Sequence, residues 1–248
     1  MPINYQQTHF GYKDVDVSEK TSMVRDVFES VAPSYDLMND LMSGGIHRLW
    51  KNTLIKRLKP HSNMELLDVG GGTGDIAFRF LKAGGKKVVI TDINEKMLTF
   101  GRDRALDNAI IGGATWVLGN AEQLPFKASS FDAYVTAFCL RNVTHLDQAL
   151  QEAERLLKPG GRFLCLEFSQ VILPALSKLY DAYSFNILPL IGQVIAKDRS
   201  SYQYLAESIR RFPTQDQFTA LIKSAGLEQV TYQNLSGGIA AIHSAWKI

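Results

Sequence analysis

Short apolar runs alternate with longer segments of helical spacing from residue 64 onward. The apolar runs have the length and composition of buried strands. They span residues 64–69, 88–91, 115–118, 133–137 and 162–168, and helices are expected between them at 75–83, 95–107 and 146–157. This alternation predicts an α/β fold in which helices flank a parallel sheet.

The end of the chain departs from this pattern. Two further β-like runs, 227–232 and 239–246, are joined by residues 234–238, which leave no room for a helix. Strands joined in this way pair antiparallel. The sequence therefore predicts a mostly parallel sheet of seven strands with an antiparallel last strand. Residues 158–161 (Lys-Pro-Gly-Gly) should end the preceding helix and turn tightly into the next strand.

Two segments outside the alternating core, 1–60 and 170–212, both look helical. The first carries the apolar stripe of a helix packed on a surface. The stripe consists of Val24, Val27, Phe28 and Val31. The second holds more aromatic and aliphatic residues than a connector needs. We expect residues 1–60 to form an N-terminal helical lid and residues 61–248 to form the main domain, with a helical substrate lid inserted at about 170–212.

Composition and charge exclude several classes of protein. With 46% hydrophobic and 21% charged residues, the chain is neither disordered nor collagen-like. The formal charge of +2 argues against a nucleic acid partner. The apolar stretch 187–196 is too short to span a bilayer, and the N-terminal residues resemble neither a secretory signal nor a transit peptide. Cys139 and Cys165 lie in apolar runs, as buried reduced thiols do, and the scattered histidines predict no metal site.

A glycine-rich segment, 68–75, ends the first predicted strand and opens a helix. Its glycines let the backbone approach a ligand, and the helix N-terminus offers N–H groups to an anion. The segment also fits the fingerprint of NAD-dependent enzymes, and Asp92 at the end of the second strand suits a ribose in either case. Asp68 and Asp75 would repel a pyrophosphate, but they suit the ammonium of an amino acid moiety. The acids therefore favour S-adenosylmethionine over NAD.

A loop at residues 119–126 follows the third strand at the carboxyl edge of the sheet, where open α/β folds bind ligands. In this loop Asn120 is suited to hydrogen-bond adenine, with Ala121 alongside. The candidate cofactor-binding residues are Asp68, Gly70, Gly72, Thr73, Gly74, Asp92, Ile93, Asn120, Ala121 and Ala137.

These segments, with Leu-Lys-Pro-Gly-Gly at 157–161, resemble class I S-adenosylmethionine-dependent methyltransferases, which have a Rossmann-like fold. Longer motifs resemble the ubiquinone and menaquinone biosynthesis C-methyltransferases. These motifs lie at 8–11, 31–40, 47–51, 140–144, 166–169, 180–185 and 201–210. The resemblance implies methyl transfer to a ring carbon of 2-methoxy-6-polyprenyl-1,4-benzoquinol, or of demethylmenaquinol in bacteria. It assigns cofactor contacts to Thr73, Asp92, Asn120 and Ala121.

Three positions depart from the pattern of that family. Cys139 stands where Gly is expected before Leu-Arg-Asn, Ala137 stands where many members have Ser, and Gly70 replaces a common Ala. The first change narrows the pocket floor, and the second removes a hydroxyl contact. Since neither removes a group that the chemistry needs, we expect an effect on affinity and not on reaction class.

Methylation of a ring carbon requires a neighbouring phenol to lose its proton and push electrons into the ring. Arg141 follows the fourth strand at the cofactor edge and is expected to stabilise the phenolate or to orient a water that takes the proton. Asn142 can orient the same oxygen. Tyr35 would reach the site only if the N-terminal segment folds over it. The same segment holds two candidate proton acceptors, Asp36 and His47.

The substrate implied by the resemblance is a polyprenyl quinol lipid, whose tail suits the apolar segment 173–195. Residues 41–64 hold five basic residues and no acid, which suits peripheral contact with anionic headgroups. Other ubiquinone-pathway proteins and a second copy of the chain are further candidate partners. The implied location is the matrix side of the mitochondrial inner membrane in a eukaryote, and the cytoplasm or the inner membrane surface in a bacterium. The alternatives are a methyltransferase for another phenolic or sterol acceptor and a cofactor-binding scaffold of a quinone-biosynthesis complex.

Overall fold

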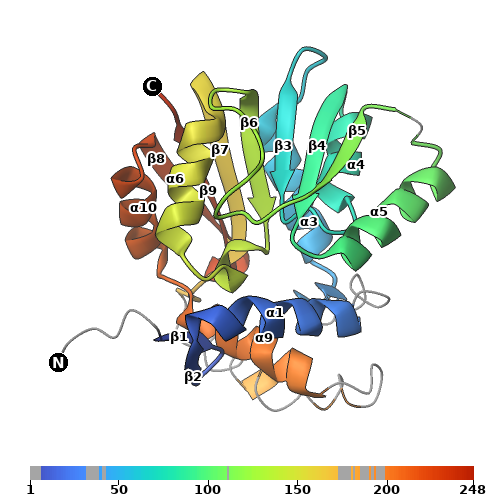
Figure 1. Ribbon diagram of the computed structural model, residues 1–248. Helices are drawn as coiled ribbons and strands as arrows, with labels where there is room; N and C mark the ends of the chain where they lie inside the picture. Colours follow the sequence, from blue (N-terminus) through green and yellow to red (C-terminus); the bar gives the residue numbers. More distant parts are fainter. Residues whose placement is uncertain are drawn as a thin grey trace.

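The computed structural model describes residues 7–31, 39–40, 43–110, 112–172, 180, 182–184, 190, 193 and 199–248. A seven-stranded sheet in the order β5-β4-β3-β6-β7-β9-β8 forms its centre (Figure 1). The strands are β3 (Glu65–Val69), β4 (Lys87–Asp92), β5 (Ala114–Leu118), β6 (Phe131–Ala137), β7 (Leu157–Phe168), β8 (Glu228–Leu235) and β9 (Ala240–Trp246). The predicted α/β class with seven strands is confirmed.

The strand directions follow from how the strands are connected. β3 pairs parallel with β4 and β6, β4 pairs parallel with β5, and β6 pairs parallel with β7. β9 runs antiparallel to both of its neighbours, β7 and β8. The antiparallel last strand was predicted from the short segment that joins the two final runs, and that prediction is confirmed.

Residues 158–161 differ from the expectation of a tight turn between a helix and a strand. They lie within β7, where the register against β6 shifts between Phe131 and Ala133. Gly160 adopts a φ of 77°, and its N–H donates to the carbonyl oxygen of Lys247 at 2.8 Å. Residues 158–161 therefore form a bulge within β7, because glycine adopts a positive φ without steric cost and the strand can continue.

Helices cover both faces of the sheet. α3 (His47–Leu58), α4 (Asp75–Lys82) and α5 (Glu95–Asp107) pack on one face, and α6 (Leu146–Leu156) and α10 (Gln215–Ser224) pack on the other (Figure 1). Leu66 points to the first face and Leu67 to the second, and both are fully buried. Burial on both faces explains why these strands are continuous apolar runs.

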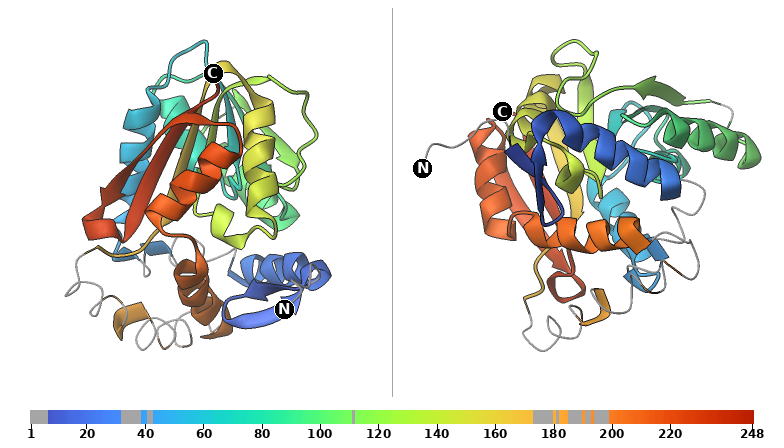
Figure 2. Two further views of the ribbon diagram at one scale, coloured as in Figure 1. Left: turned by 90° about the vertical axis from the view of Figure 1, so that its left-hand side faces the viewer. Right: turned by 60° about the horizontal axis from the view of Figure 1, so that its bottom comes forward.

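The remaining described elements lie beyond the carboxyl ends of the strands. They are the hairpin β1 (Gln7–Phe10) and β2 (Lys13–Asp16), α1 (Val17–Val31) and α9 (Arg199–Arg211). α1 and α9 run side by side below the sheet edge in both views (Figures 1 and 2). No helix in these described parts of the chain has the length and apolar character to cross a membrane.

Residues 1–60 do not form a single helical lid. Residues 7–16 are a β-hairpin, and α3 packs on the sheet with the core residues Trp50, Leu54 and Leu58. Their spacing along α3 gives this helix its own apolar stripe, which the sheet covers. Among the described residues of this segment, α1 and the hairpin lie beyond the sheet, and α3 belongs to the core.

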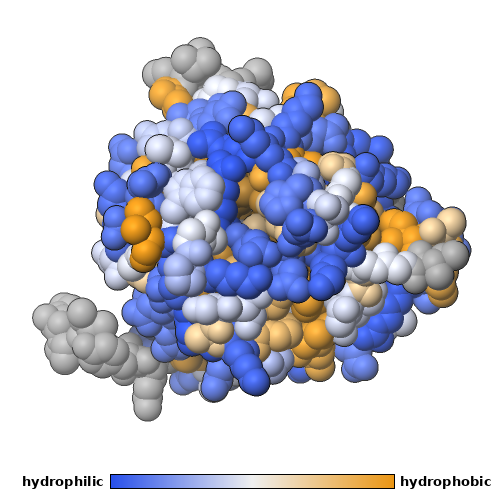
Figure 3. Space-filling model, turned by 90° about the horizontal axis from the view of Figure 1, so that it is seen from above, coloured by the Kyte–Doolittle hydropathy of each residue, from blue (hydrophilic) through white to orange (hydrophobic). Residues whose placement is uncertain are grey.

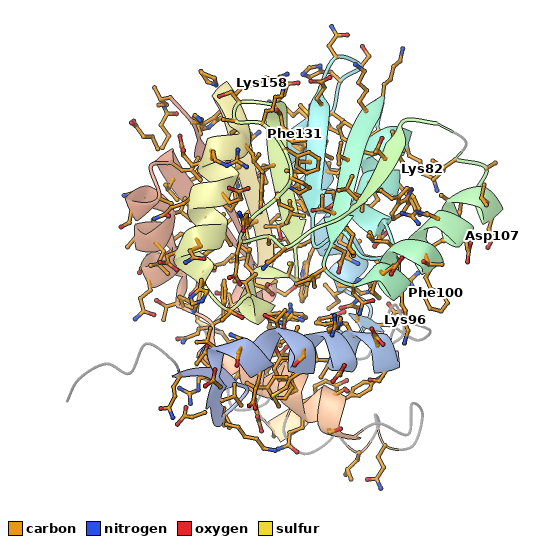
Figure 4. All side chains as sticks on the ribbon, viewed as in Figure 1. Lys82, Lys96, Phe100, Asp107, Phe131 and Lys158 are labelled. Atoms are coloured by element: carbon orange, nitrogen blue, oxygen red, sulfur yellow. The ribbon has the colours of Figure 1, made fainter. Side chains whose placement is uncertain are left out.

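The opposite end of the sheet carries mainly hydrophilic side chains (Figure 3). Lys158 lies at this end, far from α1 (Figure 4), and its ammonium pairs with Glu65 and Asp132 at 3.0 Å each. Exposed pairs of this kind contribute little stability. The chemistry suggested by the sequence is concentrated at the other end, between the sheet and α1.

Candidate active site

The loop between β3 and α4 is shaped by glycines in the left-handed region. Gly70, Gly72 and Gly74 have φ values of 64°, 52° and 81°. A Cβ on Gly74 would lie 2.8 Å from Trp116 and 2.9 Å from Phe78, so this position needs glycine for packing as well as for conformation. The loop presents Gly70 and Gly72 to a cavity.

Asp92 at the end of β4 is fixed beside this loop. Its carboxylate accepts hydrogen bonds from the N–H of Gly72 at 3.0 Å and the N–H of Asn94 at 2.9 Å. Burial raises the pKa of Asp92 to about 6, although these hydrogen bonds oppose the rise. An acid with this orientation at the cavity edge can accept hydrogen bonds from the hydroxyls of a ribose.

Asp68 at the end of β3 lies directly under the loop. A Cβ on Gly71 would come within 3.0 Å of its carboxylate. Asp68 is 1% exposed, and neither oxygen makes a hydrogen bond of normal geometry in the described part of the chain. Burial raises its pKa to about 7, against a weaker opposing effect of the Ala77 N–H. A buried carboxyl without a regular partner favours a cation above it.

Asp75 does not share this role, in contrast to the expectation that both acids hold an ammonium. Its carboxylate pairs with Lys51 at 2.8 Å and with Arg79 at 3.0 Å. Burial alone would raise the pKa of Asp75, but the two cations outweigh it and lower the pKa to about 2. Asp75 therefore joins α4 to α3, and its charge is already compensated.

The cavity between these groups and α1 holds about 700 Å³ of empty space, part of it open to solvent. Four parts of the chain line it: the glycine loop with β4 and α5, the loop after β5, the loop after β6, and α1. The lining residues are Gly70, Gly72, Asp92, Ile93 and Met97, then Asn120, Ala121 and Glu122, then Phe138, Cys139, Asn142 and Val143, and finally Thr21, Val24 and Phe28.

Seven of the residues proposed from the sequence meet in this cavity. They are Gly70, Gly72, Asp92, Ile93, Asn120, Ala121 and Asn142. Asp68, Thr73, Gly74 and Ala137 are not among its lining residues. The Thr73 hydroxyl instead accepts a hydrogen bond from Arg104 at 3.2 Å, so its side chain serves the packing of α5 on the loop.

Two other candidates from the N-terminal segment, Tyr35 and Asp36, lie outside the described residues. His47 is described at the start of α3, 2% exposed, with its Nε2 2.8 Å from the carboxylate of Asp40. Since His47 does not line the cavity, it is not placed to accept a proton there.

Arg141 lies behind the cavity wall, in the short helix η2 (Leu140–Asn142). Its guanidinium donates to the Phe138 carbonyl oxygen at 2.6 Å and to Glu167 Oε1 at 2.9 Å. The two side chains of the ion pair are 1% and 2% exposed. Burial raises the pKa of Glu167, and the adjacent guanidinium opposes the rise. The pair anchors the loop after β6 to β7.

Sequence reasoning missed several groups at this site. It recognised the apolar stripe of α1 but not the surface on which α1 packs, so Thr21, Val24 and Phe28 were not assigned to the cavity. Glu167 lies on a buried strand and within the motif 166–169, and an acid within an apolar run is a second signal that could have revealed it. Tyr204 of α9, whose hydroxyl donates to Asn142, lies in the motif 201–210 but was not singled out within it.

α1 is attached to the sheet domain by a few polar contacts. The Lys20 ammonium donates to the Val143 carbonyl oxygen at 2.8 Å, and Asn94 donates to the Arg25 carbonyl oxygen at 3.3 Å. Lys20 is 3% exposed, and burial lowers its pKa to about 8. Near the other end of the helix, Glu29 pairs with Lys96. Figure 4 labels Lys96 beside this end of α1. α1 therefore closes the cavity from the side opposite the sheet.

The basic segment at residues 41–64 is less free to attract anionic headgroups than its sequence suggests. Lys51 is buried against Asp75, and Arg48 pairs with Asp40 at 2.7 Å. Arg57 donates to Gln233 and Thr231 on β8. Asp40 lies one residue before the counted segment, so the charge count omitted it.

Both cysteines are free thiols; Cys165 is buried as expected, whereas Cys139 is half-buried and lines the cavity. Within the described ranges, no group of three or more His, Cys, Asp or Glu side chains is arranged to hold a metal ion.

Proteins with similar sequences are methyltransferases of quinone biosynthesis. The 2-methoxy-6-polyprenyl-1,4-benzoquinol methylase of Mus musculus, a mitochondrial protein, is 51% identical over 98% of this chain and 85% of its own length. The ubiquinone/menaquinone biosynthesis C-methyltransferase UbiE of Brucella abortus (strain S19) is 55% identical over 96% of this chain and 90% of its own length.

Solved structures share the fold at low identity. A possible histamine N-methyltransferase from Thermotoga maritima, an S-adenosylmethionine-dependent enzyme, aligns with a TM-score of 0.64 at 21% identity over 91% of this chain and 100% of that one. A methyltransferase of the same class from Aquifex aeolicus aligns with a TM-score of 0.58 at 14% identity over 94% and 100%. The profile of one family matches residues 15–247. The chain therefore belongs to the ubiE/COQ5 methyltransferase family.

Proposed function

We propose that this protein transfers a methyl group from S-adenosylmethionine to a ring carbon of 2-methoxy-6-polyprenyl-1,4-benzoquinol, with demethylmenaquinol as a second acceptor. Relatives with at least 50% identity over nearly the whole chain bear the names of these activities. The observation that carries the proposal is that one cavity is lined by Asp92 and Asn120 together with Asn142 and the apolar residues of α1.

The residues around the cavity fit the cofactor. Asp92 would hold the ribose hydroxyls, Asn120 and Ala121 would contact the adenine, and Asp68 would place negative potential beside the ammonium group. A Cβ on Gly72 would approach Met97 to 3.0 Å and Asp92 to 3.7 Å, so a side chain there would fill the space that a ligand needs. When bound, S-adenosylmethionine supplies a sulfonium methyl group for an in-line displacement.

The chain itself contributes orientation and exclusion of water. Val24, Phe28 and Phe138 give the cavity apolar walls that suit an aromatic ring. Asn142 lies in the wall between them and would donate a hydrogen bond to the phenolic oxygen, which stabilises the phenolate that activates the ring carbon. Arg141 acts from behind, since its bonds to Phe138 and Glu167 hold the loop that carries Asn142.

The test is a methyl-transfer assay with isotope-labelled S-adenosylmethionine and reduced short-chain quinols, with the product position read by mass spectrometry and NMR. Labelled C-methyl quinol is the expected product. Label in a sterol or a simple phenol alone would indicate another acceptor. Cofactor binding without any labelled product would indicate a scaffold and overturn the proposal.

The cofactor site has a matched pair of acid variants. Asp92→Asn should weaken S-adenosylmethionine binding by about 1–3 kcal/mol, because it replaces a charged acceptor of the ribose hydroxyls. Asp107→Asn changes an exposed acid at the far end of α5 (Figure 4) and should bind the cofactor as the unmodified protein does. Calorimetric affinities measure both, and equal affinities for the two variants would contradict the ribose assignment.

We propose a membrane-bound quinol pool as the source of the acceptor, on the mitochondrial matrix side or on a bacterial inner membrane. The support is the extreme apolarity of a polyprenyl tail and the mitochondrial and bacterial relatives. Association with other quinone-biosynthesis proteins and with a second copy of the chain belongs to the same proposal.

A further inference from the structure

Tyr204 connects the lid to the candidate reaction site. It lies on α9, is 3% exposed, and its hydroxyl donates to Oδ1 of Asn142 at 3.0 Å. Its ring stacks on Phe10 of β1 with ring centroids 4.0 Å apart and an angle of 14° between the planes. The hydroxyl position is therefore set by packing between α9 and β1, and the hydrogen bond reaches 62 residues back along the chain.

The other side of the Asn142 amide is also fixed. Nδ2 of Asn142 donates to the Phe138 carbonyl oxygen at 3.5 Å, and the same oxygen accepts a hydrogen bond from Arg141 at 2.6 Å. An amide with its oxygen on a hydroxyl donor and its nitrogen on a carbonyl acceptor has one favourable orientation, because rotation by 180° would set two acceptors against each other. A carboxamide has two N–H groups, so one N–H of Asn142 has no partner among the described residues.

We propose that Tyr204 is a positioning residue for methyl transfer: its hydroxyl holds the Asn142 amide so that the remaining N–H donates to the phenolic oxygen of the acceptor. The inference rests on the proposed function, and it adds a residue of α9 to the site. Asn142 lines the same cavity as Val24 and Phe28 of α1.

Tyr204 remains a donor throughout the working pH range. Burial raises the pKa of its phenol well above the usual value, although Arg141 nearby opposes the rise. The phenol therefore stays protonated and cannot act as the base. Tyr204 can therefore position Asn142, but another group must accept the proton.

The experiment compares Tyr204→Phe with Tyr134→Phe. The first variant removes the hydroxyl but keeps the ring that stacks on Phe10. The second makes the same change at a fully buried tyrosine of β6, whose hydroxyl makes no hydrogen bond in the described structure. For Tyr204→Phe we expect kcat to fall about tenfold, with KM for the quinol and the Kd for S-adenosylmethionine within about threefold of the unmodified protein. Tyr134→Phe should retain its kcat.

A double-variant cycle identifies the partner of Tyr204. Tyr204→Phe should lower kcat in the unmodified background but have little further effect in Asn142→Ala, because the amide it orients is then gone. Equal effects in both backgrounds would overturn the inference, as would normal kcat in Tyr204→Phe. Equal losses of kcat and cofactor binding with a lowered Tm would indicate a structural role and overturn it too. If the unmodified protein methylates no quinol, the proposed function fails first and this inference falls with it.

Discussion

Gly70 and Cys139 are two departures from the family pattern that the structure explains together. A Cβ on Gly70 would lie 2.2 Å from Sγ of Cys139 and 2.5 Å from its Cβ. The family resemblance implies Ala at 70 and Gly at 139. In this chain the side chain at 70 is absent, and a side chain at 139 occupies the space beside it. The sequence identified both substitutions but gave no reason to connect positions 69 residues apart.

This coupling predicts a non-additive variant cycle. Gly70→Ala should destabilise the protein by about 1–3 kcal/mol through overlap with the thiol and strain at positive φ. Cys139→Gly should relieve the overlap, so that Gly70→Ala costs at least about 1 kcal/mol less in that background. The φ strain is common to both backgrounds and cancels. Unfolding free energies from denaturant titration measure the cycle, and additive effects would refute the coupling.

The thiol itself is not expected to compete for the methyl group. Burial, followed by the charges of Asp92 and Glu167, raises the pKa of Cys139 to about 12. Since the thiolate is the nucleophile, the residue is nearly inert at neutral pH. Its side chain lines the cavity and so contributes to the shape of the cavity; that it narrows the pocket floor stays a prediction.

Other residues of the site differ in how far the sequence could predict them. Asp92 was found because the end of a parallel strand and its spacing from the glycines fix its position. Asp75 has the same chemistry and lies next to the same loop, but its partner Lys51 is 24 residues away on α3. Which of the two acids has its charge paired depends on tertiary packing, and the residues near each acid in the sequence do not reveal it.

At the scale of elements, helical periodicity predicted α1 but not its partner surface. The stripe of α1 includes Val24 and Phe28, which cover the cavity, whereas the stripe of α3 packs on the sheet. Periodicity reports that one face is buried but not what buries it. This is why residues 1–60 were assigned to a single lid, and why the hairpin at 7–16 was taken for helix.

The different attachments of α1 and α3 predict different responses to the cofactor. α1 is joined to the sheet domain through Lys20, Arg25 and Glu29, and it contributes residues to the cavity, so ligand binding should suppress its local opening. α3 is part of the core, and none of its residues lines the cavity. We expect S-adenosylmethionine to slow hydrogen exchange in α1 at least about tenfold and to leave α3 unchanged. Hydrogen exchange with mass spectrometry measures both helices in one sample, and equal protection would contradict the lid assignment.

For the whole molecule, the alternation of strands and helices was sufficient to predict the sheet, its class and its antiparallel last strand. Such regular features depend on local periodicity and on the handedness of connections, which apply to any sequence of this pattern. The packing of α9 against η2 depends on Tyr204 meeting Asn142, which no local rule supplies. The sequence therefore predicted the fold more fully than it predicted the contacts that α1 and α9 make with the site.

The two buried acids couple the whole molecule to pH. Asp68 and Asp92 have folded-state pKa values of about 7 and about 6, both above the value of 3.8 for an unperturbed Asp. Ionisation of these two carboxyls therefore destabilises the folded state. The free energy of unfolding is unaffected by this cost below pH 4, where both carboxyls are protonated, and it decreases as the pH rises toward 7. A cation bound above Asp68 should reverse part of this loss.

Cofactor binding should therefore release protons at mildly acidic pH. At pH 6.5 Asp68 is mostly protonated, and an ammonium group bound beside it favours the carboxylate, so we expect release of roughly half a proton or more per cofactor. At pH 8.5 the carboxyl is already ionised and contributes no release, and the cofactor's amino group, which is partly neutral at that pH, takes up protons when it binds as the ammonium. Calorimetry in two buffers with different ionisation enthalpies measures this number. Asp68→Asn should abolish most of the release while Asp75→Asn, which removes an acid already ionised at both pH values, should retain it. Identical binding enthalpies in both buffers at pH 6.5 would show that Asp68 does not face the ammonium group.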